Sequence, residues 1–132
     1  MIIFDKSMEV GVKLIDDQHR ELVAKLNAFV QGGAKSSTKE VTEAMLDSLG
    51  AYIKRHFSDE QKLHAESGFP EAAWHIEQHK YYIGEFEALR KEYLLNGVSA
   101  SFSLKLTNSL VQWFVKHIKT ADVRFGKFVA GG

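Results

Sequence analysis

Residues 75–93 read HIEQHKYYIGEFEALRKEY, and this stretch decides the class of fold. Histidine and apolar side chains recur in it at intervals of three and four residues, which is the repeat of one face of an α-helix. That face consists of His75, His79, Tyr82, Ile83, Phe86, Leu89 and Tyr93. Pro70 suits the first turn of such a helix, and Asn96-Gly97 suits its end. We therefore predict an amphipathic helix over residues 70–96.

The same helical spacing recurs in three other segments, at about residues 17–32, 38–66 and 100–124. Their core-facing side chains are Ile15, His19, Leu22, Val23, Leu26 and Val30; then Val41, Met45, Leu49, Tyr52, Ile53, His56, Glu60 and Leu63; and then Phe102, Leu106, Leu110, Trp113, Phe114 and His117. The expected start and stop signals are Asp16 or Asp17, Gly32-Gly33, Ser37 with Glu40, and Ser99 or Ser101. Four such helices with short loops pack most simply as an up-down-up-down bundle. We expect one all-α domain, a four-helix bundle over residues 1–132 with an N-terminal arm at 1–15.

Composition limits the classes of function. The chain has 132 residues, 17 basic and 17 acidic side chains, six histidines and no cysteine. The lack of cysteine excludes disulfides, thiolate metal sites and cysteine nucleophiles. The balanced charge argues against nucleic acid or an acidic membrane surface as a partner. Apolar runs stay below the roughly 18 residues of a membrane span, and the N-terminus shows no signal-peptide core, so we expect a cytoplasmic protein.

Polar side chains occupy core-facing positions that an ordinary bundle fills with apolar ones. They are His19, His56, Glu60, His75, His79 and His117. Burying an unpaired polar group costs about 1–3 kcal/mol, and a bare carboxylate costs far more, so the group needs a shared partner. In an up-down-up-down bundle all six lie toward one end, because helix starts and helix ends alternate there. Residue counts from the turns at Gly68 and Gly97 place most of them at similar heights, since a helix rises about 1.5 Å per residue.

The local spacings are those of metal ligands on helices. The HxxxE motif at 56–60 and the HxxxH motif at 75–79 each put two ligands one turn apart on one face. Asp122 follows His117 by five residues, which on a regular helix turns its carboxylate about 140° away. A π-bulge between them would restore the contact, and such bulges favour functional sites. Imidazole and carboxylate suit iron, zinc, copper or nickel, and seven such ligands suit two ions bridged by carboxylates.

With these residues in place, the sequence resembles the hemerythrin family, in its bacterial single-domain form, over nearly the whole chain. Four motifs carry the resemblance: Asp16-Asp17-Gln18-His19, His56-Phe57-x-x-Glu60, Phe69-Pro70 before His75-x-x-x-His79, and Trp113-x-x-x-His117-Ile118-x-x-x-Asp122. Each motif alone is a weak signal, but the four in this order and at these separations are a specific one. A relative in that family, myohemerythrin, is a standard example of the up-down bundle.

The resemblance implies a non-haem di-iron centre that binds O2 reversibly. By position, the implied ligands are His75, His79 and His117 for one iron, His19 and His56 for the other, and Glu60 and Asp122 as bridges between both. An oxo or hydroxo group would also bridge the ions, and O2 would bind as a hydroperoxide on the two-histidine iron. A histidine-rich set favours reversible binding, whereas ferritin-like di-iron oxidases are richer in carboxylate.

An apolar wall around the centre would admit O2 and hinder water and protons. The side chains expected to contribute to it are Leu22, Val23, Phe57, Trp113, Phe114 and Ile118. Three positions depart from the family pattern: Gln61 stands where an acid is common, Phe4 where tryptophan is common, and His64 where methionine is usual. For His64 we weigh a proton donor near the pocket, an extra ligand and an exposed side chain, and we favour the exposed side chain.

Three classes of function compete. The first is O2 binding for carriage, storage or sensing, with O2 as the ligand and an unidentified protein as its acceptor. The second is a di-iron enzyme, either an oxidase, a peroxidase or an NO-consuming protein, and His64 motivates it. The third is a metal-free or regulatory interaction module. We expect the first, an O2-binding protein and not an enzyme, with two iron ions as its cofactor.

Overall fold

Helices and their connections form the part of the chain that the computed structural model describes, which is residues 2–29, 39–97 and 99–131. Three long helices come first: α1 (Lys13–Ala28), α3 (Lys39–Ser67) and α4 (Ala72–Asn96). The fourth rod is divided into α5 (Ala100–Lys105), η3 (Leu106–Gln112), α6 (Trp113–His117), η4 (Ile118–Asp122) and α7 (Val123–Val129). A short 3-10 helix, η1 (Lys6–Met8), lies in the N-terminal arm.

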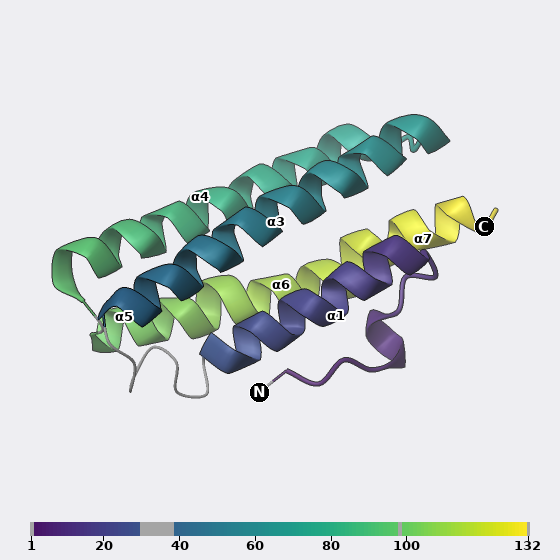
Figure 1. The fold of residues 1–132 in the computed structure, drawn as a ribbon. Helices are drawn as coiled ribbons and strands as arrows, with labels where there is room; N and C mark the ends of the chain where they lie inside the picture. The colour runs from purple at the N-terminus through teal and green to yellow at the C-terminus, as the bar shows by residue number, and fades with distance from the viewer. Residues whose placement is uncertain (1, 30–38, 98, 132) are drawn as a thin grey trace.

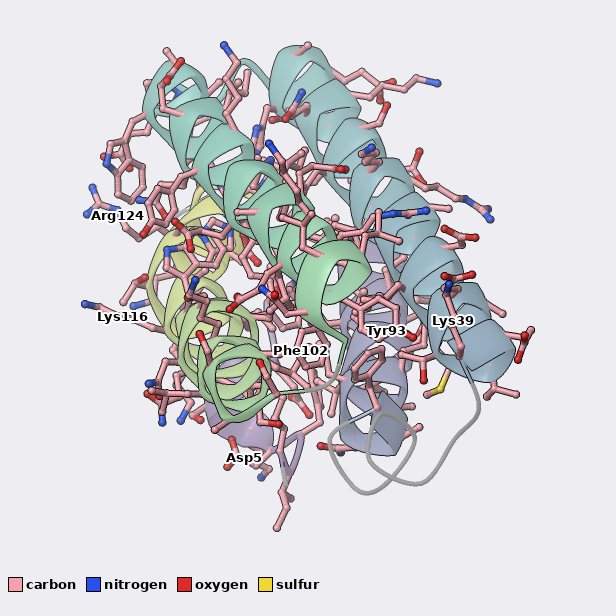
Figure 2. The ribbon with its side chains drawn as sticks, turned by 90° about the vertical axis from the view of Figure 1, so that its left-hand side faces the viewer. Asp5, Lys39, Tyr93, Phe102, Lys116 and Arg124 are labelled. Atoms are coloured by element: carbon pink, nitrogen blue, oxygen red, sulfur yellow. The ribbon has the colours of Figure 1, made fainter. Side chains whose placement is uncertain are left out.

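The four rods run alternately up and down beside one another (Figure 1). Helix α1 packs on α3, α3 packs on α4, and α4 packs on α5 and η3. The starts of α1 and α4 therefore meet the ends of α3 and of the fourth rod at one end of the bundle. Figure 2 views the rods from the other end, where Tyr93 of α4 lies near Phe102 of α5. The predicted all-α, up-down-up-down four-helix bundle is confirmed.

The core is one apolar cluster to which every rod contributes. Its largest fully buried members include Leu22, Phe57, Tyr82, Phe86, Phe102 and Phe114. Each side chain of this size contributes about 1.5–3 kcal/mol when it leaves water. Gly50 lets α3 approach α4 closely, because a Cβ atom there would lie 2.6 Å from the ring of Phe86.

The N-terminal arm changes the expected start of the first helix. Helix α1 begins at Lys13 rather than near residue 17, and Asp16 lies inside its first turn. The Asp16 carboxylate accepts hydrogen bonds from the backbone N–H groups of Val10 (2.8 Å) and Gly11 (3.1 Å), so it holds the arm instead of capping the helix. An acidic side chain in a first turn is also favoured by the helix dipole.

The other predicted helix signals have different outcomes. Ser99 caps the fourth rod as expected, because its hydroxyl accepts a hydrogen bond from the Phe102 N–H at 3.0 Å. Gly97 ends α4 in a left-handed conformation (φ 67°) that glycine adopts without strain. Helix α4 begins at Ala72, so Pro70 lies in the preceding turn and not in the first turn of the helix. The signals expected at Gly32-Gly33 and Ser37 lie outside the described residues.

The fourth rod contains two π-helical segments, η3 and η4. The widening predicted between His117 and Asp122 is confirmed, since η4 covers Ile118–Asp122. The segment η3 has no counterpart in the sequence prediction. It is fixed from α4 by the Tyr82 hydroxyl, which donates to the carbonyl oxygen of Leu110 at 2.9 Å.

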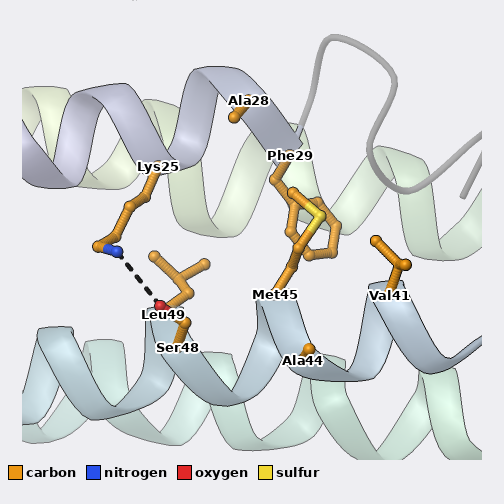
Figure 3. Close-up of a pocket in the computed structure, with 8 residues that line it drawn as sticks. All are labelled: Lys25, Ala28, Phe29, Val41, Ala44, Met45, Ser48 and Leu49. Atoms are coloured by element: carbon orange, nitrogen blue, oxygen red, sulfur yellow. Dashed lines mark hydrogen bonds between the residues drawn. The ribbon is translucent and has the colours of Figure 1, made fainter.

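A surface groove lies between the end of α1 and the start of α3 (Figure 3). Its walls are mostly apolar, and Lys25 closes one side by donating to the Ser48 hydroxyl at 3.2 Å. This groove is at the opposite end of the bundle from the predicted ligands, so it does not bear on their chemistry. No helix in the described part of the chain has both the length and the apolar character needed to cross a bilayer.

Candidate metal centre

The four rods bring all seven predicted ligands together inside the bundle. Helix α1 supplies His19, α3 supplies His56 and Glu60, α4 supplies His75 and His79, α6 supplies His117, and η4 supplies Asp122. All seven are buried, with at most 2% of each residue exposed. Amphipathic helices normally turn apolar residues to this position. Seven polar residues buried side by side therefore indicate a common partner.

The seven side chains form two groups that share their carboxylates. One group consists of Glu60, His75, His79, His117 and Asp122, and the other consists of His19, His56, Glu60 and Asp122. Within each group the potential ligand atoms all lie within 4.8 Å of one another. Such a pair of groups suits two neighbouring cations with carboxylate bridges.

Asp122 divides its two oxygens between the groups. Its Oδ1 atom lies 2.7 Å from Nε2 of His75 and 3.0 Å from Nε2 of His117. Its Oδ2 atom lies 3.0 Å from Nε2 of His19, in the other group. The π-helical segment η4 makes this possible, because it returns Asp122 to the face of the rod that carries His117.

Glu60 completes the contact with α4. Its Oε1 atom lies 2.9 Å from Nε2 of His79 and 3.3 Å from Nε2 of His75. Because Glu60 and His56 are one turn apart on α3, the same helix face presents a ligand to each group.

Glutamine side chains contact three of the histidines at the ring nitrogen that points away from the centre of the site. The Nδ1 atoms of His56, His79 and His117 lie 2.7, 3.1 and 2.8 Å from amide oxygens, which belong to Gln18, Gln61 and Gln78 respectively. With Nδ1–H donating to an amide, each ring has a bare Nε2 to offer a cation. The orientation of the first amide is fixed independently, because its Nε2 donates to Asp59 at 2.8 Å.

Sequence reasoning missed the role of these glutamines. Gln61 stands out in the sequence only as a departure from the family pattern, while Gln18 and Gln78 each precede a ligand by one residue and follow no helical repeat. Their roles depend on which neighbouring helix each faces, and the spacing along one helix does not contain that information.

The donor set fits cations because many of its buried atoms lack a hydrogen bond. Within the described residues, the following buried atoms of the site have no hydrogen-bond partner: His19 Nδ1 and Nε2, His56 Nε2, His79 Nε2, Glu60 Oε1 and Oε2, and Asp122 Oδ2. Some of these atoms touch, as His79 Nε2 and Glu60 Oε1 do, but without the alignment of a hydrogen bond. An unsatisfied buried polar atom costs about 1–3 kcal/mol, and two metal ions would satisfy each of these atoms except His19 Nδ1, because an imidazole binds an ion through one nitrogen.

The electrostatics favour ionised carboxylates in the site. Burial and the charge of Asp122 raise the pKa of Glu60, but the His75 and His79 rings outweigh them and bring it to about 2. Burial also opposes ionisation of Asp122, yet the facing histidines, His117 first, hold its pKa well below its usual range. Two negative charges are therefore present at neutral pH to neutralise cations.

The histidines differ in their protonation. Burial, and then the neighbouring His19, lower the pKa of His56 to about 3, so this ring is neutral at pH 7. Burial also lowers the pKa of His75, but the carboxylates of Asp122 and Glu60 prevail and raise it to about 9. Without a cation, His75 thus carries the proton that partly balances the two carboxylates.

Aromatic rings enclose the ligands. Phe57 stacks on His79 with ring centroids 3.8 Å apart, and Trp113 stacks on His117 at 4.7 Å. Phe114 presents its ring to His19 edge-on at 5.7 Å. Leu22, Val23 and Ile118 are buried in the apolar core cluster. The assignment of these six residues to the wall of an O2 pocket stays a prediction.

The expectation that His64 is exposed is wrong. His64 is buried, with 1% of the residue exposed, and its ring centroid lies 4.4 Å from that of His75 and 4.5 Å from that of Phe125. Burial lowers its pKa to about 4, so the ring is neutral. The error arises because the end of α3 is covered by the C-terminal helix α7, and helical spacing alone does not show that cover.

Comparison with known proteins gives matches over nearly the whole chain. Residues 10–127 match the protein family described as the hemerythrin HHE cation binding domain. The bacteriohemerythrin of Stenotrophomonas maltophilia (strain R551-3) is 25% identical over 92% of this chain and 77% of its own length. The myohemerythrin of Sipunculus nudus is also 25% identical, over 93% of this chain and 89% of its own. A crystal structure of wild-type hemerythrin has the same fold, with a TM-score of 0.81 at 22% identity, covering 96% of this chain and 95% of its own.

Proposed function

Because the chain belongs to the hemerythrin family, we propose that it binds O2 reversibly at a non-haem di-iron centre. The observation that carries the proposal is the pair of buried donor groups that share Glu60 and Asp122. A protein that stores or carries O2 needs a site that holds two redox-active ions in place and releases O2 unchanged. A buried set of five imidazoles and two carboxylates meets the first requirement.

The ligands that we assign follow the two donor groups. His75, His79 and His117 would hold one iron, His19 and His56 would hold the other, and Glu60 and Asp122 would bridge both. The division of Asp122 between the groups, Oδ1 toward one and Oδ2 toward the other, supports the bridging role. The group with two histidines has fewer donors, so the open position for O2 belongs there.

When bound, two ferrous ions supply O2 with a coordination position and with two electrons. The residues of the chain do the rest. Gln18, Gln61 and Gln78 orient three of the imidazoles by accepting their Nδ1–H hydrogen bonds. The burial of Phe57 and Phe114 against the ligands favours exclusion of water, which would otherwise promote release of reduced oxygen.

The test is the absorbance spectrum of the iron-loaded, reduced protein through an O2 cycle. We expect charge-transfer absorption to appear with O2 and to disappear on deoxygenation over several cycles. Elemental analysis of the same sample should give two irons for each chain, as a seven-donor set requires. Irreversible conversion to the oxidised form in the first cycle would overturn reversible binding, and zinc or manganese at full occupancy would overturn the assignment of iron.

Catalytic turnover is a separate question from O2 binding, and the same preparation addresses it. We propose a binding protein and not an enzyme, so peroxide and NO should not be consumed catalytically. Delivery of O2 to a protein acceptor and a cytoplasmic location, both predicted from the sequence, stay predictions.

A further inference from the structure

His64 is a buried histidine that the ligand set leaves unused, and we propose that it positions His75. In this role its imidazole accepts the hydrogen bond from Nδ1–H of His75 and so keeps Nε2 of His75 directed at the metal. The inference rests on the proposed function, because it concerns the orientation of one ligand of that centre.

His75 lacks the support that three other ligands have. A ligating histidine almost always donates its second ring N–H to an acceptor, which fixes both the tautomer and the ring orientation. His56, His79 and His117 each have a glutamine oxygen at Nδ1. The Nε2 atom of His75 lies toward the centre, 2.7 Å from Asp122, but its buried Nδ1 meets no hydrogen-bond partner in the described ranges.

His64 also lacks hydrogen-bond partners among the described residues, and its ring lies beside that of His75. Neither of its ring nitrogens has a hydrogen-bond partner within the residues that the structure describes, although the side chain is fully buried. The ring centroids of His64 and His75 are 4.4 Å apart, with 45° between the planes. The proposed bond requires a turn of the His64 ring about its Cβ–Cγ bond, which brings a nitrogen lone pair to Nδ1–H of His75.

The other rings around His64 do not compete with His75 for its hydrogen bond. Phe69 and Phe125, with ring centroids at 5.2 and 4.5 Å, offer no lone pair. His79, at 6.3 Å, already has Gln61 at its Nδ1. The ring of Phe125 stands at 78° to that of His64, an edge-on arrangement that suits a weak N–H···π contact from the second nitrogen.

The role requires a nitrogen or oxygen hydrogen-bond acceptor at this position. Methionine, which is usual here in the family pattern, has only a weak sulfur acceptor. Glutamine carries the same amide oxygen that supports the other three ligands, so His64→Gln should preserve the function. His64→Met keeps a large apolar side chain among the phenylalanines but removes the nitrogen acceptor.

The first experiment measures the hydrogen bond in the wild-type protein. The protein, labelled with 15N in histidine and loaded with zinc in place of iron, is examined by NMR for scalar coupling across an N–H···N bond. We expect coupling between Nδ1 of His75 and a ring nitrogen of His64, and an Nδ1–H proton that exchanges slowly with water. Absence of this coupling in a zinc-loaded sample overturns the inference without the use of any variant.

The second experiment measures zinc affinity by chelator competition for the wild type, H64M, H64Q and Q78L. Loss of such an acceptor typically weakens metal binding by roughly 10- to 100-fold, so we expect that loss in H64M and in Q78L, which removes the known partner of His117. H64Q should stay close to the wild type. Circular dichroism of the metal-free proteins controls for folding.

The outcomes separate the two hypotheses. If H64M binds zinc as the wild type does, or if H64Q loses as much affinity as H64M, the inference is wrong while the centre stands. If the wild-type chain holds neither zinc nor iron, the proposed function is wrong and the inference falls with it.

Discussion

At the scale of single residues, Asp122 and Glu60 connect the two donor groups of the site. Each belongs to both donor groups, and each is fully buried with its charge retained. A buried carboxylate is stable only when opposite charge and hydrogen bonds compensate its lost hydration. His75, whose pKa is raised to about 9, supplies part of that compensation without metal, and cations would supply all of it.

Removal of one bridging carboxylate should lower the metal content. We expect Glu60→Ala to reduce iron below the two ions for each chain that a seven-donor set holds, because both donor groups lose a ligand. Elemental analysis after iron-replete expression measures this. Glu66→Ala, an exposed acid on the same helix, is the matched control and should keep full iron. An unchanged iron content in Glu60→Ala would show that the ligand assignment is wrong.

The sequence identified the seven side chains that come together in the bundle, but not the residues that support them. The HxxxE and HxxxH spacings identify ligands because one helix turn fixes the distance between two side chains. The contact of Gln78 with His117 joins two helices, and so does the contact of His64 with Phe125. Such contacts depend on the rotation and height of a second helix, which a repeat within one helix does not determine.

At the scale of elements, the two π-helical segments of the fourth rod have different roles. Segment η4 aligns Asp122 with His117, as the five-residue spacing predicts. Segment η3 lies earlier in the same rod, where Tyr82 of α4 donates to the Leu110 carbonyl. The Tyr82 side chain is fully buried, and burial raises the pKa of its hydroxyl well above the usual range. This one hydrogen bond therefore joins α4 to the irregular part of the fourth rod.

Tyr82→Phe should destabilise the protein near neutral pH and remove part of its sensitivity to alkali. The variant loses one of the hydrogen bonds to the Leu110 carbonyl, which also accepts from the Trp113 backbone N–H. The loss of one such bond costs about 0.5–1.5 kcal/mol. The pKa of Tyr82 is raised in the folded state, so its contribution is complete below about pH 10 and then falls by about 1.4 kcal/mol for each pH unit. Urea unfolding should show that the difference in free energy of unfolding between wild type and variant is smaller at pH 11 than at pH 9.

The control for this pH effect is Tyr81→Phe. Tyr81 is an exposed neighbour on the same helix, so its loss should change the free energy of unfolding little at either pH. A gap between wild type and Tyr82→Phe that stays constant from pH 9 to pH 11 would contradict the buried, neutral hydroxyl.

The N-terminal arm depends on a close approach to α7. A Cβ atom at Gly126 would lie 1.9 Å from the carbonyl oxygen of Val10, so Gly126→Ala must displace the arm. We expect a loss of about 1–3 kcal/mol in the free energy of unfolding, as for other overpacked positions. Gly84→Ala is the matched control, because a Cβ there meets nothing within 4 Å on α4. It should stabilise the helix by about 0.5–1 kcal/mol, and equal effects of the two variants would contradict the close contact.

At the scale of the whole molecule, the bundle has two ends with different sources of stability. The end around Tyr93 and Phe102 is held by apolar and aromatic packing. The opposite end buries the histidines and carboxylates, and several of their atoms lack a hydrogen-bond partner within the described residues. The stability of the protein should therefore depend on metal, and the dependence should be concentrated at that end.

Removal of metal should lower the melting temperature and loosen the ligand end. A ligand present at about 1,000 times its dissociation constant stabilises the folded state by about 4 kcal/mol, and chelation removes this contribution. Thermal unfolding with and without chelator measures the total effect. Hydrogen exchange should show faster exchange near His56 and His75 and little change near Leu46. Equal acceleration at both ends of the bundle would contradict a local effect of the metal.

The sequence alone predicts the four helical rods, their order and the seven side chains that come together in the bundle, because these depend on repeats within one helix and on the alternation of helix directions. It also determined the π-bulge before Asp122, since a five-residue spacing cannot place two ligands on one face of a regular helix. The tertiary structure alone decided that His64 is buried, that Asp16 holds the arm and that three glutamines support the ligands. The contacts of His64 and of the glutamines join segments distant in the chain, and they are fixed only when the helices pack. Asp16 contacts backbone only five and six residues away, but the path of the arm that brings this backbone to it follows no helical repeat.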